Sequence, residues 1–261
     1  MFERGNGFTD LSETASITAP SQVSMANFAS ISMPKTRSAL AIFCRAPRLG
    51  SVKTRLAKAR GDKFALGLYR AMLADTFALG RALAPEIETF ACFTPGNGFD
   101  GADSLAPLWD GPRIAQCQGD LGAKLLGCFA DLRARGFEKT AVIGSDSPDL
   151  PIHLLREAFS VLNDYEMAIG PSLDGGFYLM SAGVELPAAV FHRVVWSSSS
   201  TLENVQSNLQ QLSKEAATTV CYSLAPWRDV DDEGDLIELK RRLCEVGTHA
   251  PHTRDFLAEN F

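Results

Sequence analysis

The chain has 261 residues, of which 46% are hydrophobic, and its formal net charge is -6 at pH 7. A chain of this length can bury one sizeable α/β core, or at most two small ones. The acidic balance makes a DNA or RNA polymer an unfavourable partner, although a local cluster of basic residues is enough to bind a single nucleotide.

The cysteines and the apolar runs indicate the compartment. The six cysteines lie far apart and form no C-x-x-C pair, so a zinc–thiolate site has no support. A chain this long needs no disulfides, and its N-terminus lacks the apolar core of a signal peptide. The longest apolar runs, such as Ala39 to Phe43, are too short to cross a bilayer. We therefore predict a cytoplasmic protein with reduced thiols and no membrane partner.

Residues 1–36 differ in composition from the rest of the chain. They are rich in Ser, Thr, Ala and Asn, with few large aliphatic residues and no sustained periodicity. This pattern predicts a loosely ordered tail, and it leaves Met25 or Met33 open as the natural start. We expect a single domain over residues 37–261, because no internal repeat and no inter-domain linker follows the tail.

Strand and helix patterns alternate from residue 38 onward. Short apolar runs predict strands at residues 38–44, 86–93, 113–117, 140–144, 167–170, 177–181 and 218–224. Apolar spacing predicts helices at residues 62–83, 121–135, 151–162, 201–212 and 232–246, and the Gly, Pro and Asp content of 94–111 predicts a loop. The alternation predicts an α/β fold, a three-layer α/β/α sandwich with a mainly parallel, mixed central sheet.

A basic loop follows the first predicted strand directly. Between residues 45 and 60 there are six basic residues and no acidic one, although the chain is acidic overall. Open α/β sheets bind ligands at such loops, Gly50 permits close backbone approach, and Lys53 and Arg55 can contact phosphates. We interpret the loop as a phosphate site, with an ordinary solvated basic surface as the alternative. It matches neither the Walker A pattern nor G-x-G-x-x-G.

Two carboxylates follow the strand predicted at 140–144. Asp146 lies where such a sheet meets its ligand crevice, and a carboxylate there can hold Mg²⁺ or Mn²⁺ together with substrate phosphates. Asp149 allows two interpretations of equal weight, because it either joins the metal or caps the helix that begins near Pro151.

The Asp-Gly-Gly segment at Asp174, Gly175 and Gly176 also has two interpretations. Asp-Gly is a strong turn signal, so the segment can be an ordinary turn between two strands. The paired glycines can also let an acceptor lie against the backbone. By itself the motif favours neither.

Residues 229–235 contain five carboxylates. Asp232 and Glu233 suit the start of the helix predicted there, because acidic residues stabilise a helix N-terminus. Asp229 and Asp231 are two residues apart, as on a strand end, and could face a metal that bridges to phosphates.

Other polar residues give weaker signals. The four histidines match no metal-binding pattern, and His249 and His252 lie in what we predict to be a polar tail. Trp196 and the four serines after it are interpreted as a polar turn, with a substrate loop as the alternative. The chain has no G-x-S-x-G motif, so a serine nucleophile has no support.

Five motifs occur in order along residues 38–256. They are F-C-R-A-P-R-L-G-S-V-K-T-R-L, Q-G-D-L-G, G-S-D-S-P-D-L, G-P-S-L-D-G-G-F-Y-L and D-V-D-D-E-G-D-L. In this order they resemble the radical-SAM/selenodomain-associated transferase family 1. That family looks related to 2-phospholactate and molybdenum cofactor guanylyltransferases, which implies the glycosyltransferase-A-like fold of nucleotide-diphospho-sugar transferases.

The resemblance implies a role for each candidate residue. Lys53 and Arg55 match the basic residues that meet the nucleotide phosphates, and we expect Arg45, Pro47 and Gly50 of the same loop to contribute to this site. Those that would act in catalysis are Lys53, Arg55 and Asp146, and those that would hold Mg²⁺ or Mn²⁺ are Asp146 and Asp231. The acceptor would lie against Asp174, Gly175 and Gly176. Ser147 and Leu49 depart from the family pattern, in which cysteine and proline are common, but neither is a proposed ligand.

The leading hypothesis is a metal-dependent transferase that moves a nucleotidyl group from an NTP to a small phosphorylated acceptor and releases pyrophosphate. Glycosyl transfer from a nucleotide-sugar is the alternative, and a non-catalytic nucleotide or nucleotide-sugar binding protein is the alternative of another class. The expected partners are a nucleotide or nucleotide-sugar and a small-molecule acceptor. The base, the acceptor and a homo-oligomeric state stay open.

Overall fold

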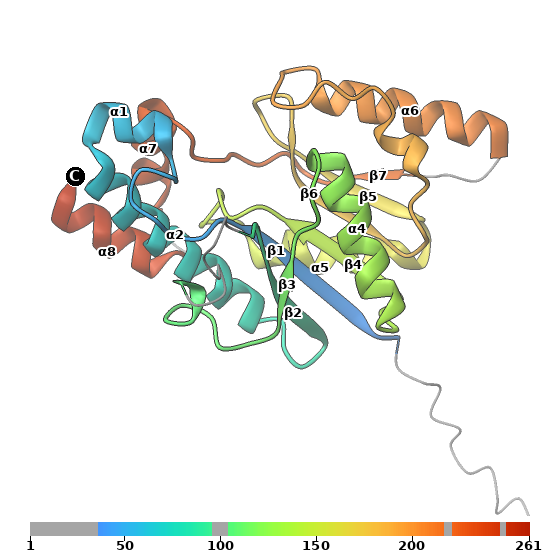
Figure 1. The fold of residues 1–261 in the computed structure, drawn as a ribbon, viewed down its shortest axis with the longest axis horizontal. Coiled ribbons are helices and arrows are strands. Elements are labelled where there is room, and N and C mark those ends of the chain that lie inside the picture. The colour runs from blue at the N-terminus through green and yellow to red at the C-terminus, as the bar shows by residue number, and fades with distance from the viewer. Residues whose placement is uncertain (1–35, 96–103, 217–220, 246–248) are drawn as a thin grey trace, which may run out of the picture. The chain divides into compact units, whose positions relative to one another are not determined.

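The computed structural model describes residues 36–95, 104–216, 221–245 and 249–261 (Figure 1). The predicted tail at 1–36 lies outside these ranges except for Thr36, as does part of the predicted loop at 94–111. The division of the chain into a tail and one domain therefore stays a prediction. Within the described ranges, no helix combines the length and the apolar character that a bilayer crossing requires.

The described residues form one seven-stranded sheet. Its strands are β1 (Ser38–Cys44), β2 (Ile87–Phe93), β3 (Arg113–Ala115), β4 (Lys139–Ile143), β5 (Met167–Pro171), β6 (Phe177–Ala182) and β7 (Cys221–Ser223). They lie in the order β3-β2-β1-β4-β6-β5-β7. Neighbouring strands are parallel except that β6 runs antiparallel to both β4 and β5. The prediction of a mainly parallel, mixed sheet is confirmed.

Both faces of the central strand β1 are buried. Leu40 and Ile42 point to one face and Ala39 and Ala41 to the other, as the two-residue repeat of a strand requires. The helices that pack on the first face are α2 (Asp62–Arg81) and α5 (Ile152–Ser160), and those on the second are α4 (Leu121–Ala134) and α6 (Thr201–Ala216). This arrangement confirms the three-layer sandwich.

A separate buried cluster packs three more helices against α2. They are α1 (Thr54–Arg60), α7 (Glu233–Arg242) and α8 (Pro251–Asn260), and Figure 1 shows them together beside α2. Leu56, Met72 and Leu239 are fully buried in this cluster. The cluster fixes the position of α1, which forms the end of the basic segment at 45–60. It also fixes α7, which follows the carboxylates at 229–232.

The prediction of a polar tail at the end of the chain is wrong, because this segment contains the packed helix α8. Only a few apolar side chains, such as Leu257, mark it in the sequence. Its start is held by the buried Asp75 carboxylate, which accepts from His252 N–H at 3.1 Å, Thr253 N–H at 2.8 Å and the Thr253 hydroxyl at 2.6 Å. Burial raises the pKa of Asp75, and these donors offset part of that rise.

The predicted boundaries differ from the structure by a few residues. β3 ends at Ala115, and Pro151 is the N-cap of α5 rather than part of its first turn. Two 3₁₀ turns are η1 (Val161–Asn163) and η2 (Ala188–Phe191). The first of them continues α5. Helix α1 was not predicted from the sequence, because its single buried residue, Leu56, is too little to show periodicity.

Candidate active site

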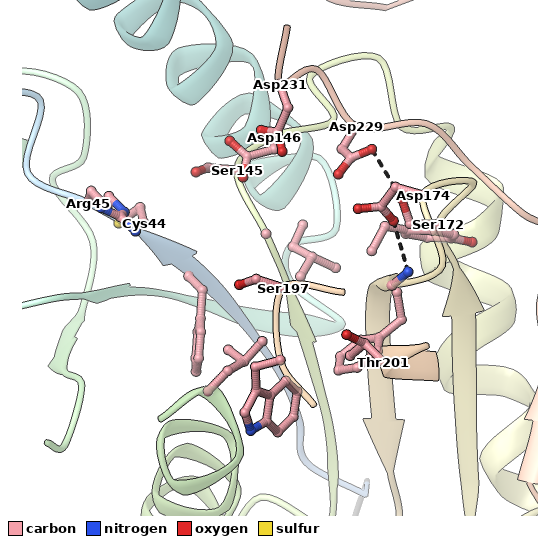
Figure 2. Close-up of a pocket in the computed structure, with 18 of the residues that line it drawn as sticks. Cys44, Arg45, Ser145, Asp146, Ser172, Asp174, Ser197, Thr201, Asp229 and Asp231 are labelled. Atoms are coloured by element: carbon pink, nitrogen blue, oxygen red, sulfur yellow. Dashed lines mark hydrogen bonds between the residues drawn. The ribbon is translucent and has the colours of Figure 1, made fainter. Parts of the chain in front are cut away.

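A cavity of about 790 Å³ opens at the carboxyl ends of the parallel strands. Cys44, Thr94 and Gly144, which end or follow β1, β2 and β4, line it. Because β6 runs in the opposite direction, its first residues reach the same edge of the sheet. Residues 196–199 and 229–231 complete the walls, and Figure 2 shows the polar side chains that face the cavity. This is the edge at which open α/β sheets bind ligands.

Lys53 turns its side chain into the protein, where it is only 5% exposed. It is the N-cap of α1 and has φ 46° and ψ 48°, a left-handed conformation uncommon for a residue with a side chain. Its Nζ lies 2.5 Å from Asp146 Oδ1, 3.3 Å from Asp231 Oδ1 and 2.5 Å from the Val230 carbonyl oxygen. An ammonium has three N–H donors, so these three contacts engage all of them.

The neighbours of Lys53 maintain its charge. Burial lowers the pKa of the ammonium, but the carboxylates of Asp146 and Asp231 raise it by more, and the net shift is upward. Lys53 is therefore a charged internal cation at the edge of the cavity.

Asp146 and Asp231 stay open to the cavity although both contact Lys53. Their side chains are 45% and 42% exposed, and Figure 2 shows them next to each other. The Val230 N–H donates to the Asp146 carbonyl oxygen at 2.9 Å, which ties the two segments together. Arg55 is exposed and reaches Asp231 Oδ2 at 3.6 Å. The structure thus brings together four of the seven residues assigned to metal and phosphates, namely 53, 55, 146 and 231.

A third carboxylate, Asp229, lies beside this pair. Its Oδ1 accepts a hydrogen bond from the Ser172 hydroxyl at 3.2 Å (Figure 2). Burial, together with the charges of Asp174 and Asp231, raises the pKa of Asp229 to about 6. The carboxylates at this end of the cavity therefore already repel one another, which disfavours a further anionic group there.

The donor set suits a divalent cation that is shared with a substrate. Among the described residues, no group of three or more His, Cys, Asp or Glu side chains is placed to hold a metal ion. Asp146 and Asp231 nevertheless offer the hard oxygen ligands that Mg²⁺ prefers, and Mg²⁺ is commonly held by one or two carboxylates plus phosphates. The residues present fit such an ion, provided that the substrate supplies the remaining ligands.

Asp149, the other carboxylate after β4, neither lies at the candidate metal site nor caps α5. It is fully buried and forms a two-pronged pair with Arg242, whose Nε lies 2.7 Å from Oδ2 and whose Nη2 lies 3.2 Å from Oδ1. It lies outside the cavity lining, and the N-cap of α5 is Pro151 without a side-chain bond. The interpretation of Asp232 as a helix cap is confirmed, because it accepts from the N–H groups of residues 234 and 235.

The Asp-Gly-Gly turn is packed against the serine loop that follows Trp196. Asp174 accepts from the Gly176 N–H at 2.8 Å, and both residues line the cavity. Gly175 has φ 89°, and a Cβ there would lie 2.1 Å from the Ser199 carbonyl oxygen. Gly175 is thus required by close backbone packing, whereas Asp174 and Gly176 face the cavity.

The remaining residues of the predicted phosphate loop separate into two groups. Arg45 is exposed and lines the cavity, and its backbone N–H donates to the Tyr69 hydroxyl at 2.8 Å. Pro47 is buried and Gly50 is exposed, and neither lines the cavity. Gly50 instead adopts φ 73°, a left-handed turn that favours glycine. Their assignment to the phosphates stays a prediction.

One wall of the cavity was not predicted from the sequence. Lys124, near the start of α4, and Trp196 both line it, although Trp196 was interpreted mainly as part of a polar turn. The Trp196 Nε1–H donates to Asp120 Oδ2 at 3.2 Å, and Asp120 also caps α4 by accepting from the Ala123 N–H. The available signal is position, since the Q-G-D-L-G motif follows β3 at the carboxyl edge of the sheet.

Comparisons with known proteins agree with this fold. A family model described as an uncharacterized protein conserved in bacteria (DUF2064) matches residues 81–198. A candidate nucleotide-diphospho-sugar transferase from Desulfovibrio desulfuricans G20 is 28% identical, with a TM-score of 0.76, over 85% of this chain and 94% of that one. No curated protein matches the chain.

A second solved structure resembles the chain at lower identity. The 4-diphosphocytidyl-2C-methyl-D-erythritol synthase from Anaerococcus prevotii DSM 20548 is 12% identical, with a TM-score of 0.51, over 80% of this chain and 97% of that one. At this identity the likeness concerns the fold alone. The fold is that of the nucleotide-diphospho-sugar transferases, as predicted, while the narrower resemblance to the radical-SAM-associated family stays a prediction.

Proposed function

We propose that this chain is a metal-dependent transferase that uses a nucleotide donor. The observation that carries the proposal is one cavity in which two half-exposed carboxylates, Asp146 and Asp231, lie close to the basic loop. Phosphate groups need cationic neighbours and a metal ion that bridges them to carboxylates. The description of the 28% identical D. desulfuricans protein as a candidate nucleotide-diphospho-sugar transferase supports the same class.

In the form that we favour, an NTP transfers its nucleotidyl group to a small phosphorylated acceptor. An acceptor phosphate oxygen forms a bond to the α-phosphorus, the bond from this phosphorus to the bridging oxygen breaks, and pyrophosphate leaves. Arg45 and Arg55 would hold the departing phosphates, and Lys124 would hold the phosphate of the acceptor. Catalysis of this kind needs positioning and charge rather than a nucleophilic side chain.

The other residues of the cavity have separate tasks in this scheme. Asp146 and Asp231 would hold Mg²⁺ or Mn²⁺, which supplies charge neutralisation at the phosphates when bound. Lys53 keeps the two carboxylates side by side through its contacts with both. The acceptor would lie against Asp174 and Gly176, on a turn that the serine loop makes rigid.

Glycosyl transfer from a nucleotide-sugar is the second candidate, and one observation favours it. Asp174 and Asp229 bring negative charge to the end of the cavity assigned to the acceptor, and Ser172 and the serine loop surround them with hydroxyl groups. Carboxylates accept hydrogen bonds from sugar hydroxyls but repel a phosphorylated acceptor. The two candidates therefore differ in what occupies this end.

The decisive experiment combines ligand binding with product analysis. Thermal unfolding of the protein would be followed with a panel of NTPs and nucleotide-sugars, with and without Mg²⁺ or Mn²⁺. A ligand at ~100 times its dissociation constant adds about 2.7 kcal/mol of stability, which raises the melting temperature measurably. Metal-dependent stabilisation by an NTP, followed by pyrophosphate release with an acceptor, is the expected result.

Three other outcomes would change the conclusion. Release of a nucleoside diphosphate from a nucleotide-sugar would replace nucleotidyl transfer with glycosyl transfer. If a donor stabilises the protein but no EDTA-sensitive turnover is detected, a non-catalytic nucleotide-binding protein would be favoured. The absence of stabilisation by every donor, with and without metal, would overturn the proposal.

A further inference from the structure

Lys53 places a positive charge where a metal ion between Asp146 and Asp231 would also bind. Its Nζ contacts the same oxygen type on both residues, Asp146 Oδ1 at 2.5 Å and Asp231 Oδ1 at 3.3 Å. The third donor is held by the Val230 carbonyl oxygen at 2.5 Å. With its side chain 5% exposed and three partners around it, the ammonium cannot contact a phosphate without giving up one of these partners.

We propose that Lys53 is a resident counter-cation of the carboxylate pair, which competes with the divalent metal and moves to the donor phosphates when the metal binds. The inference rests on the proposed function, because it takes Asp146 and Asp231 as the metal ligands. It assigns Lys53 a positioning role in the metal-free protein, in addition to the phosphate contact expected from the sequence.

Charge explains why the two cations exclude one another. An ammonium and a divalent ion that share these oxygens would lie within a few ångströms of each other, where like charges repel strongly in a partly buried site. The metal alone therefore has to displace Lys53 and leave the ammonium without its partners. A nucleotide donor supplies phosphate oxygens as replacement partners, so metal and donor are expected to bind cooperatively.

Arg55 provides a matched comparison because it also pairs with Asp231, but through an exposed contact. Its Nη1 lies 3.6 Å from Asp231 Oδ2, and its side chain is 70% exposed. It contacts only one of the two carboxylates, and solvent screens an exposed pair of this kind. Removal of Arg55 should therefore change metal affinity much less than removal of Lys53.

The first test measures Mn²⁺ binding to the full chain, without nucleotide, by isothermal titration calorimetry. We expect Lys53→Met to bind Mn²⁺ at least about tenfold more tightly than the wild type, the ratio that corresponds to an ion pair of about 1.4 kcal/mol. Arg55→Met should change the affinity by less than about threefold, the size expected for an exposed pair. Asp146→Asn should lose binding.

The outcomes separate this inference from the proposed function. Equal Mn²⁺ affinities of the wild type and Lys53→Met, with binding lost in Asp146→Asn, would overturn the competition and leave the metal site standing. Failure of every form to bind Mn²⁺, with or without an NTP or a nucleotide-sugar, would overturn the metal site and the inference together.

A second test uses the unmodified sequence, so it does not depend on the folding of a variant. The wild type would be acetylated briefly with an N-hydroxysuccinimide ester at rising Mg²⁺ concentrations, and each lysine would be quantified by peptide mass spectrometry. Release by the metal should raise the labelling rate of Lys53 several-fold, whereas Lys214, which is exposed on α6 and lies outside the cavity lining, serves as the internal reference. An unchanged Lys53 rate at Mg²⁺ concentrations that saturate binding would overturn the proposal.

Discussion

Two ion clusters join the segment after β4 to the C-terminal part of the chain, and they differ in how their charges are matched. Asp149 and Arg242 pair one to one, with side chains 0% and 11% exposed. Lys53 is shared by Asp146 and Asp231, whose side chains are about half open to the cavity. Burial of charge is tolerated only where each charge is fully paired. The first cluster is closed to solvent, whereas the carboxylates of the second remain accessible to a ligand.

The largest expected effect concerns the matched pair. Asp149→Ala leaves the Arg242 guanidinium buried without its carboxylate and should lower the free energy of unfolding by about 3–5 kcal/mol, measured by urea denaturation. The control is Arg241→Ala, because Arg241 forms exposed pairs with Glu238 and Glu245 that contribute less than about 1 kcal/mol. Similar losses in both variants would contradict the difference between buried and exposed pairs.

Substitution in the cluster of Lys53, Asp146 and Asp231 should affect activity more than stability. Asp146→Asn should lower the free energy of unfolding by less than Asp149→Ala does, because the buried Lys53 keeps Asp231 and the Val230 carbonyl oxygen as partners. The same change should lower turnover by at least about a hundredfold once a substrate is identified, since it removes a charge that acts on the transferred group. An active Asp146→Asn enzyme, assayed beside the wild type, would remove Asp146 from the proposed machinery.

The Asp-Gly-Gly turn at residues 174–176 depends on backbone packing rather than on charge. Gly175→Ala places a methyl group against the Ser199 carbonyl oxygen at a residue with φ 89°, so we expect a loss of about 1–3 kcal/mol in thermal or urea unfolding. Gly176→Ala is the matched control, because its nearest atom, Asp174 Oδ1, is 3.1 Å away and belongs to a side chain that can move. A larger loss for Gly176→Ala than for Gly175→Ala would contradict this account of the turn.

The smallest expected effect is a pH dependence from Asp75, which is buried with hydrogen-bond donors rather than in a pair like that of Asp149. Its pKa in the folded protein is raised above the ordinary value of 3.8, so the folded state binds the proton more tightly than the unfolded state. Stability from this group therefore falls as pH rises from below 3.8 through the raised pKa.

Urea unfolding of the wild type and Asp75→Asn over this pH range measures that contribution. The difference in unfolding free energy, wild type minus variant, should become smaller as pH increases, because asparagine does not titrate. A difference that increases with pH would mean that the donors from His252 and Thr253 outweigh burial and depress the pKa.

The strands and the basic loop could be predicted because their signals are local. Burial on both faces gives β1 and β4 continuous apolar sequences, and Lys53 and Arg55 follow the first of these at the edge where ligands bind. The partners of Asp149 and Asp75 could not be predicted, because the bonds that they form cross 93 and up to 178 positions. The same reason contributes to the missed helix α8, whose start is stabilised by Asp75 in addition to the local signal of Pro251.

The location of Asp231 has a consequence for synthesis of the protein. The Val230–Asp146 backbone bond and the Lys53 contacts complete the site with a segment that follows every strand of the described sheet. Domains form while the chain emerges from the ribosome, N-terminal parts first. A nascent chain that has already paired β1 with β4 therefore still lacks Asp231, one of the two proposed metal ligands. The ability to bind a donor should appear only after translation has passed the acidic segment at 229–231.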